Sequence, residues 1–243
     1  MKKTLFACWY LTLFTLMTII SGLICLLVSL FSKGLSRRIT GQVWARIVLD
    51  PAFVKVEVVR GQELLPSPNQ GGYIIFANHR SLLDIPTVAQ ATKRNVSWVA
   101  KQDLGRIPIF GWTLKRVHML IDRQGGAEAA KRMISQASAR LSAGEILAIF
   151  PEGTRNKTEA PLLPFKKGAF IMAKHSQVPL VPLAIYNSGK LWPSGSLTPE
   201  PGTIKVAIGE PLRAHKDQSL NLLRDRAQKS LEELYLSLEK DWA

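Results

Sequence analysis

Cysteine is scarce in this sequence, and the two cysteines are badly placed for pairing. Cys8 and Cys25 are the only cysteines among 243 residues. If the first segment is helical, they lie about 25 Å apart along its axis, which is too far for a disulfide. The chain therefore has neither a disulfide framework nor the paired-cysteine spacing of a zinc site, which fits a reducing compartment.

Several sequence motifs that would identify a chemistry are also missing. There is no G-x-S-x-G sequence, which argues against a serine hydrolase with a nucleophile elbow. Neither a G-x-G-x-x-G fingerprint nor a Walker A loop occurs, so no nucleotide cofactor is indicated. We expect no metal and no other resident cofactor.

Acidic residues are few compared with basic ones. The sequence has 32 Lys and Arg against 18 Asp and Glu, a formal net charge of +14, and the excess is concentrated in residues 93–132. This basic section predicts a polyanionic partner: nucleic acid, phosphorylated metabolites or anionic lipid headgroups. The chain has no motif of a nucleic-acid module and no aromatic stacking pattern among its basic residues, so we do not expect nucleic acid. A membrane-tethered binder of anionic lipid or nucleic acid is the alternative from a different functional class.

No charged residue occurs in residues 4–32, and basic residues stand on both sides of this run. It is longer than the apolar region of a signal peptide and no small-x-small cleavage site follows, so we predict a membrane-resident helix. Its orientation is open because both flanks are basic: it spans the bilayer, or it dips into one leaflet and turns back at residues 32–38. One apolar helical face is then expected from Ile39, Val43, Trp44 and Ile47.

The rest of the chain has the alternating pattern of an α/β domain. We divide the chain into a membrane-associated helical segment, residues 1–58, and an α/β domain, residues 59–243. Continuous apolar runs predict strands buried on both faces of a mostly parallel sheet flanked by helices. The predicted strands cover residues 55–59, 73–77, 96–100, 117–121, 146–150, 180–185 and 203–209, with helices over 127–145 and 220–238.

Charged and polar residues follow four of these strands at the point where each ends. They are Asn78 and His79, then Lys101, then Asp122 and Arg123, and finally Pro151 to Arg155. In open α/β sheets ligands bind outside the carboxyl ends of the strands. If the strands are parallel, the four groups converge on one crevice that holds a base and several cations, which is the composition of an anion-binding site.

The stretch FANHRSLLD (76–84) places a histidine and an aspartate five positions apart. This spacing suggests a general base, His79, with an orienting carboxylate, Asp84. Simpler interpretations remain open. Asp84 could cap a helix that starts near Pro86, His79 could be an ordinary loop histidine, and residues 152–155 could form a turn with a surface ion pair.

Four blocks of sequence resemble those of the glycerolipid acyltransferases, in the same order along the chain. They are NHRSLLD (78–84), KQDLGRIPIFG (101–111) continued by IDR (121–123), FPEGTR (150–155) followed by LLPFKKGAF, and VPLVPLAI (178–185). The resemblance covers about residues 70–211. It implies a glycerolphosphate-acyltransferase-like fold with an N-terminal helical membrane anchor.

The resemblance also implies an activity, namely acyl transfer from acyl-CoA or acyl-carrier protein to the sn-2 hydroxyl of 1-acyl-glycerol-3-phosphate, giving phosphatidic acid. Because the nucleophilic hydroxyl belongs to the substrate, the chain needs no nucleophile of its own and no covalent acyl-enzyme. His79 would remove the hydroxyl proton and Asp84 would orient the imidazole. Glycerol-3-phosphate and another lysolipid, such as a lyso-ornithine lipid, are the alternative acceptors.

Further residues are assigned to substrate binding by the same resemblance. Arg155 would be the main phosphate contact because its guanidinium matches phosphate oxygens. The other substrate-binding candidates are Glu152, Gly153, Thr154, Lys101, Arg123 and Asn78. The expected location is the cytoplasmic (inner) membrane, with the catalytic domain on the cytoplasmic side, and the oligomeric state is left open.

Overall fold

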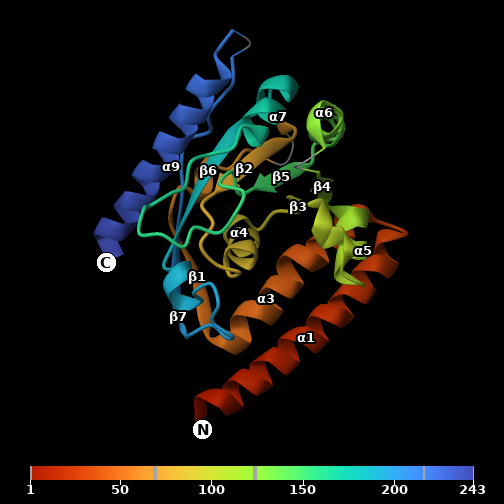
Figure 1. Ribbon diagram of the computed structural model, residues 1–243, viewed down its shortest axis with the longest axis vertical. Coiled ribbons are helices and arrows are strands. Elements are labelled where there is room, and N and C mark those ends of the chain that lie inside the picture. The colour runs from red at the N-terminus through yellow and green to blue at the C-terminus, as the bar shows by residue number, and fades with distance from the viewer. Residues whose placement is uncertain (1, 68–69, 123–124, 216, 243) are drawn as a thin grey trace.

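A central sheet organises the molecule (Figure 1). The computed structural model describes residues 2–67, 70–122, 125–215 and 217–242. Within these residues the strands form a seven-stranded sheet with the order β1-β7-β6-β2-β5-β3-β4. The strands are β1 (Val54–Arg60), β2 (Tyr73–Ala77), β3 (Val96–Lys101), β4 (Met119–Ile121), β5 (Ile146–Ile149), β6 (Leu180–Tyr186) and β7 (Gly202–Ile208).

The sheet is mostly parallel, as predicted. Strands β2 to β6 run in one direction, whereas β7 pairs antiparallel with β6 and parallel with β1. The predicted domain boundary at residue 58 falls inside β1, whose pairing with β7 makes it part of the same sheet.

Helices cover both faces of the sheet. The longer ones are α1 (Lys2–Ser29), α4 (Asp84–Thr92), α5 (Phe110–Val117), α6 (Gly126–Ser142), α7 (Gly168–Ser176) and α9 (Leu220–Trp242). Shorter turns are α2 (Lys33–Arg38), the π-helical segment Ile39–Val43, α3 (Trp44–Leu49), α8 (Ser188–Leu191) and 3₁₀ turns at Asp50–Ala52, Gln62–Leu64 and Gln102–Arg106. Helices α6, α7 and α9 cover one face, and α4 and α3 cover the other, with α1 outside them (Figure 1).

The sequence of β2 explains how one strand holds both layers together. Side chains alternate across a strand, so Ile74 and Phe76 join the core under α7 and α9 while Tyr73, Ile75 and Ala77 join the core on the α4 side. All five are buried. Burial of each large apolar side chain contributes about 1.5–3 kcal/mol to folding, which accounts for the continuous apolar run.

Helix α1 and the segment after it form a helical hairpin. The chain turns at residues 30–32, and α2, the π-helical segment and α3 return alongside α1. The Ser36 hydroxyl donates to the Cys25 carbonyl at 2.9 Å, and the Tyr10 hydroxyl donates to the Val48 carbonyl at 3.0 Å. The body of the protein therefore lies along most of α1.

The expected position of the turn needs correction. The turn precedes residues 33–38, which are helical because the Ser32 hydroxyl caps α2 by accepting from the Leu35 amide. A π-helical segment (39–43) precedes α3. Of the four residues expected to share an apolar face, Val43 is half exposed and Ile39, Trp44 and Ile47 are half-buried, whereas Ala45, Val48 and Leu49 are the buried residues of α3.

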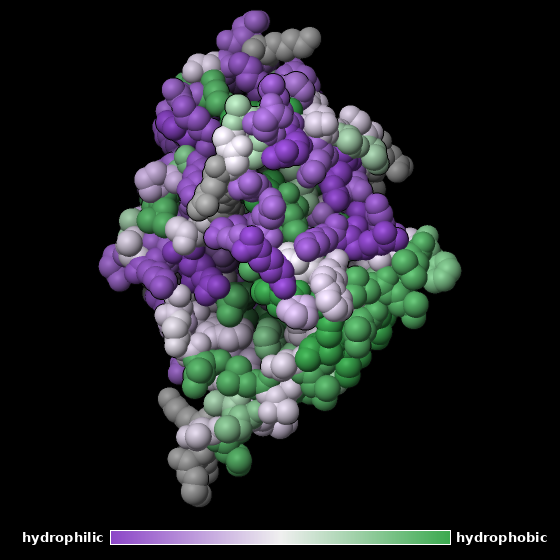
Figure 2. All heavy atoms as spheres, turned by 45° about the vertical axis from the view of Figure 1, so that its right-hand side comes forward, coloured by the Kyte–Doolittle hydropathy of each residue, from purple (hydrophilic) through white to green (hydrophobic). Residues whose placement is uncertain are grey.

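The outer side of α1 is apolar and exposed. Figure 2 shows this side as a continuous hydrophobic band beneath a strongly hydrophilic body. Exposed apolar residues of the hairpin are Leu5, Trp9, Leu16, Leu23, Leu27, Leu30, Phe31 and Leu35. Residues Thr4–Ser29 are long and apolar enough to cross a membrane. Because one side of α1 is packed against the body, the opposite side is the one available to lipid.

Candidate active site

The carboxyl ends of the parallel strands bring the predicted site residues to one edge of the sheet. The registers pair Phe76 with Ile149 and Lys101 with Ile121, so these strands end at similar heights. His79 and residues 153–155 line one cavity together with Lys101. The convergence predicted from the strand pattern is therefore confirmed for these residues, while Arg123 lies outside the described residues.

His79 and Asp84 form a hydrogen-bonded pair, with Nδ1 of His79 at 2.8 Å from Oδ2 of Asp84. The same Oδ2 accepts from the backbone amides of Arg80 at 2.7 Å and Ser81 at 2.7 Å. An oxygen that already accepts two N–H bonds takes the third contact as an acceptor too, so Nδ1 carries the proton. The other ring nitrogen, Nε2, then has a free lone pair and can act as a base.

Asp84 is not the cap of helix α4. The helix begins at Asp84 itself, its N-cap is Leu83, and no side chain caps it. The fully buried carboxylate instead accepts from the loop that precedes the helix and from His79. The geometry thus favours the orienting function over the capping alternative, while the catalytic assignment of both residues stays a prediction.

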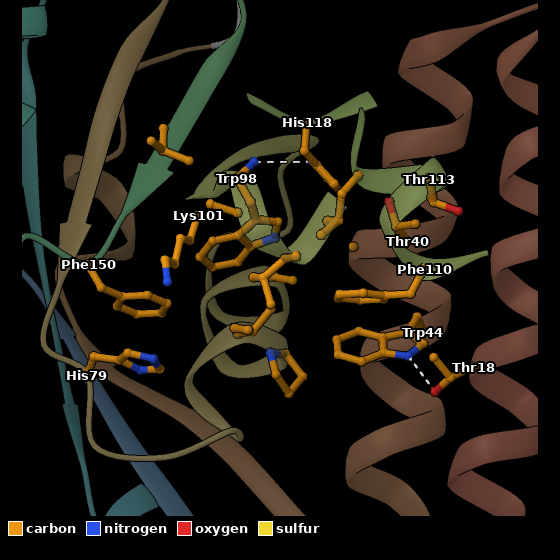
Figure 3. A pocket seen from close by; sticks show the side chains of 18 of the residues that line it. Thr18, Thr40, Trp44, His79, Trp98, Lys101, Phe110, Thr113, His118 and Phe150 are labelled. Atoms are coloured by element: carbon orange, nitrogen blue, oxygen red, sulfur yellow. Dashed lines mark hydrogen bonds between the residues drawn. The ribbon is translucent and has the colours of Figure 1, made fainter. Parts of the chain in front are cut away.

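An aromatic stack fixes the plane of the His79 ring. The ring of Phe150 lies parallel to it with centroids 4.0 Å apart and an interplanar angle of 9°. Trp98 stacks on Phe150 in turn, at 5.5 Å and 23°. Figure 3 shows His79 and Phe150 side by side at one end of the cavity. The stack leaves the imidazole edge, which carries Nε2, directed along the cavity.

Glu152 joins the His79 loop to the loop that follows β5. Its Oε1 accepts from the backbone amide of His79 at 2.7 Å, and Oε2 accepts from the amide of Leu163 at 2.9 Å. Burial raises the pKa of Glu152 to about 7, opposed by the hydrogen bonds from Leu163 and His79. Both carboxylate oxygens are engaged with backbone, so the structure gives Glu152 a bracing function, and substrate binding by it stays a prediction.

Asn78 has a similar structural function. Its side-chain amide donates to the Ile185 carbonyl at 2.8 Å, and its side-chain oxygen accepts from the Ile185 amide at 2.7 Å. Asn78 follows the last residue of β2 that pairs with β6, and its side chain continues the hydrogen bonding between the two strands. The buried amide group is therefore occupied by β6, and a contact of Asn78 with substrate is still only predicted.

Three predicted binding residues lie at the mouth of the cavity, namely Thr154, Arg155 and Lys101. Lys101 pairs with Asp103 at 2.5 Å, and both side chains are about half exposed. Gly153 adopts a left-handed backbone with φ of +73°, and a Cβ there would lie 2.9 Å from the Lys166 side chain. The glycine is therefore required by the turn itself, whatever its contact with substrate.

The cavity has a volume of about 360 Å³ and extends from His79 to α1. Figure 3 shows His79 and Phe150 at one end, Trp98 in the middle, and Phe110 with Trp44 near the helical hairpin. Most of the lining is apolar, including Ile85, Pro86, Ala89, Trp98, Phe110 and Leu114. Its dimensions and apolar walls suit an alkyl chain or another apolar ligand.

His118 lines the interior of this cavity and is buried. Burial, together with Arg37 and Arg140, lowers the pKa of His118 to about 3, so the ring is neutral. Its Nδ1 accepts from the Trp98 amide at 3.2 Å, which leaves the proton on Nε2. A neutral imidazole is compatible with an apolar channel.

The sequence patterns did not identify the aromatic and histidine residues of the cavity. Trp44, Trp98, Phe110, His118 and Phe150 stand singly in different elements, without a shared spacing. Phe150 precedes the PEGTR stretch directly, and this position at a strand end was the one available signal. In the part of the chain that the structure describes, no three His, Cys, Asp or Glu side chains are grouped to hold a metal ion.

Comparisons with known proteins identify the class. The Acyltransferase family model matches residues 56–186, more than half of the chain. The chain belongs to the Acyltransferase family.

Particular relatives share a more specific name. The chain is 35% identical over 135 residues to a 1-acyl-sn-glycerol-3-phosphate acyltransferase of Helicobacter pylori, which covers 56% of this chain and 57% of that protein. It is 29% identical over 197 residues to the enzyme of that name from Pseudomonas aeruginosa, covering 79% of this chain and 74% of that protein. The chain spans 53–59% of the length of four curated relatives that it matches.

The fold is similar to a solved structure along its whole length. That structure is the 1-acyl-sn-glycerophosphate (LPA) acyltransferase PlsC from Thermotoga maritima, at 25% sequence identity and a TM-score of 0.82. The match covers 100% of this chain and 98% of the other. The predicted α/β fold with an N-terminal helical segment is therefore confirmed.

Proposed function

We propose that this protein transfers a fatty acyl group from an acyl thioester to the sn-2 hydroxyl of 1-acyl-sn-glycerol-3-phosphate, giving phosphatidic acid. The observation that carries the proposal is the hydrogen-bonded pair of His79 and Asp84. The His79 ring, whose Nε2 is free, lines an apolar cavity of about 360 Å³. The names of the relatives support the choice of acceptor. The donor is acyl-CoA or acyl-carrier protein, and no covalent acyl-enzyme forms.

The reaction needs one proton carrier. His79 Nε2 takes the proton from the substrate hydroxyl while that oxygen attacks the thioester carbonyl carbon. The tetrahedral intermediate collapses, the carbon–sulfur bond breaks, and the departing sulfur receives the proton from His79. The products are an ester and a free thiol. Asp84 holds the imidazole in the tautomer that this sequence requires and stabilises the transient imidazolium.

The mouth of the cavity supplies the phosphate contact. In the described part of the chain Arg155 makes no ion pair, whereas Lys101 is paired with Asp103. We therefore assign Arg155 as the primary ligand of the glycerol phosphate and Lys101, Thr154 and Gly153 as its neighbours. Glu152 joins the loop of His79 to the segment around Leu163, and Asn78 joins the end of β2 to Ile185 of β6, through bonds to backbone groups.

The apolar hairpin places this site next to lipid. The cavity reaches Thr18 and Gly22 of α1, so an acyl chain with its head at His79 points towards the membrane-facing helices. Because the body is packed along α1, we propose that α1 lies within one leaflet with its exposed side in the acyl chains. We assign the body to the cytoplasmic side of the cytoplasmic membrane, which protease accessibility in intact and opened cells would test.

The decisive experiment is an acceptor and donor panel on the purified chain in neutral detergent. Lysophosphatidic acid, glycerol-3-phosphate and a lyso-ornithine lipid are each incubated with acyl-CoA and with acyl-carrier protein, and products are identified by mass spectrometry. Phosphatidic acid as the main product is the expected outcome. Product from another acceptor alone would replace the assigned substrate, and no ester from any pair would leave a lipid-binding protein as the better description.

Arg155→Ala tests the phosphate contact. We expect the KM for lysophosphatidic acid to rise about tenfold or more, because a charge-assisted hydrogen bond is lost. Arg226→Ala, on the exposed surface of α9, is the matched control for a lost positive charge. An unchanged KM and kcat in Arg155→Ala would remove Arg155 from the phosphate site.

A further inference from the structure

A second cleft lies at the amino edge of the parallel strands, opposite the edge that carries His79. Tyr73 begins β2, Ile146 begins β5, and both line this cleft, whose volume is about 540 Å³. Its lining shares no residue with the His79 cavity. The two ends of β2 are about 13 Å apart, because a strand rises about 3.3 Å per residue. The cleft is therefore a separate site.

Positive charge dominates this cleft. The basic residues of its lining are Arg37, Arg38, Arg46, Lys93 and Arg94, against the single acidic residue Glu145. Glu145 already binds Arg37 at 3.0 Å and Arg140 at 2.9 Å. In the described ranges the other four cations of the lining have no ion pair. Lys93 and Arg94 follow the end of α4, Arg38 lies in the last turn of α2, and Arg46 lies in the last turn of α3. The helix dipole favours a cation at each of these positions, but it does not explain why three helix ends bring four cations without an ion pair into one cleft.

Buried polar atoms of the same cleft lack hydrogen-bond partners. They are Nε of Arg37 and Nε of Arg94. The Tyr73 hydroxyl lies beside the Arg94 guanidinium, which can only donate, so the hydroxyl proton has no acceptor. Tyr73 is 1% exposed and Arg37 is 9% exposed, so water does not freely replace the missing acceptors. Unpartnered buried donors are costly and rare in folded proteins, and several in one cleft point to a ligand that supplies acceptor oxygens. A phosphate group provides such oxygens together with the charge that the arginines require.

The position of α2 indicates whether this phosphate belongs to a lipid headgroup or is free in solution. Arg38 lies three residues after Leu35 on this helix, so both share one face. Leu35 is 50% exposed and Phe31, in the turn just before α2, is 86% exposed, which continues the apolar surface of α1 to the edge of the cleft. Basic residues beside a lipid-facing apolar surface favour the phosphate of an anionic headgroup over a phosphate free in solution.

We propose that this amino-edge cleft binds the phosphate group of an anionic membrane lipid, at a site distinct from the one beside His79. The arginines hold the phosphate and the Tyr73 hydroxyl donates to it. The apolar side of the hairpin accommodates the acyl chains of the same lipid. The proposal does not depend on the proposed acyl transfer, since it concerns binding alone.

The test uses the full-length protein in nanodiscs and in neutral detergent. Phosphatidylglycerol is the lipid probe, because it is anionic and is neither the acceptor nor the product proposed above, and phosphatidylcholine is the neutral reference. Arg38→Gln with Arg46→Gln is compared with a control that removes two positive charges from α9, Arg226→Gln with Lys240→Gln. We expect the cleft variant to weaken phosphatidylglycerol binding at least about tenfold and the control to leave it unchanged.

A second arm titrates inorganic phosphate in detergent and includes Tyr73→Phe, which removes one hydroxyl and leaves the charge unchanged. Weaker lipid binding in Tyr73→Phe, with its thermal unfolding unchanged, supports the proposed contact. Phosphate binding that depends on Arg38 and Arg46 without any lipid preference would keep the cleft but replace its ligand by a soluble phosphate. Equal binding by wild type and the cleft variant in both arms would overturn the proposal. Acyl transfer measured in parallel keeps this outcome separate from the proposed function.

Discussion

The two edges of the parallel sheet differ in how fully their buried polar groups are hydrogen-bonded. At the carboxyl edge the side chains of Asn78 and Glu152 and the Oδ2 atom of Asp84 bond to backbone amides or carbonyls of neighbouring segments. At the amino edge, Nε of Arg37 and Nε of Arg94 are buried without partners, and the proton of the Tyr73 hydroxyl has no acceptor. The two edges share the same strands, so strand packing alone does not produce the difference.

The difference indicates that polar groups position a side chain at one edge and can bind a ligand at the other. Polar groups whose hydrogen bonds are all made within the protein hold the His79 loop in one geometry, as a catalytic base requires. A buried donor without an acceptor in the protein can instead bond to a ligand. The exceptions at the carboxyl edge are Oδ1 of Asp84 and the hydroxyls of Thr87 and Ser188, which are buried without a partner. Substitutions at both edges therefore test the comparison.

The largest effect is expected from His79→Ala. The substitution removes the proposed base, whose Nε2 is free and lies near the mouth of the cavity. We expect kcat to fall about 10³–10⁴-fold while the protein remains folded and membrane-associated. Turnover is measured with lysophosphatidic acid and an acyl thioester. His175→Ala, on the exposed surface of α7, is the control. Substantial activity in His79→Ala would disprove the base assignment.

Asp84→Asn should have the second largest effect. A neutral amide oxygen in the place of Oδ2 is a weaker acceptor for His79 and the two backbone amides than a carboxylate oxygen, and the substitution removes the negative charge beside the imidazole. We expect kcat to fall about 10²–10³-fold because that charge no longer stabilises the imidazolium, with KM little changed. Asp225→Asn, exposed on α9, is the control, and a kcat equal to wild type would reduce Asp84 to a structural residue.

Glu152 makes stability depend on pH. Its pKa is raised from 4.5 to about 7 in the folded protein, so the fold retains a proton that the unfolded chain releases. The free energy of unfolding should therefore fall as pH rises from about 4.5 to about 7, by up to about 3 kcal/mol, and level off above that. Urea unfolding of wild type and Glu152→Gln at about pH 5 and about pH 8 measures this difference.

Glu152→Gln should flatten this pH dependence because glutamine does not titrate. It also loses one of the two backbone hydrogen bonds, at a cost of about 1–3 kcal/mol measured at the acidic pH. A wild-type protein whose stability does not change over this pH range would contradict the raised pKa.

The smallest effect contrasts the two edges directly. Asn78→Ala leaves the buried amide and carbonyl of Ile185 unpaired and should destabilise the protein by about 1–3 kcal/mol. Tyr73→Phe removes a buried hydroxyl that lies beside Arg94 but whose proton has no acceptor, so ligand-free stability should change by less than in Asn78→Ala. Thermal unfolding of both variants provides the measurement. Equal destabilisation would mean that the amino edge is as fully paired as the carboxyl edge.

Much of the fold and part of the site followed from sequence. The apolar runs gave β2 (Tyr73–Ala77) with its exact bounds, and the helix predicted over 127–145 corresponds to α6 (Gly126–Ser142). His79 and Asp84 could be paired in advance because they stand five positions apart, within reach of each other in one loop. The turn after α1 was misplaced, because a single serine cap and a π-helical segment decide where α2 begins and how it continues.

The local order of residues determined the strands, the long apolar run and the His–Asp pair, because each depends on neighbours a few positions apart. Tertiary structure decided which polar groups bond within the protein, since Asn78 and Glu152 stand inside motifs but bond to Ile185 and Leu163, far along the chain. It also assembled the amino-edge cleft from α2, α3, β2 and the end of α4, segments without a common motif. Burial and hydrogen bonding between distant segments are properties of the folded chain, so no local pattern encodes them.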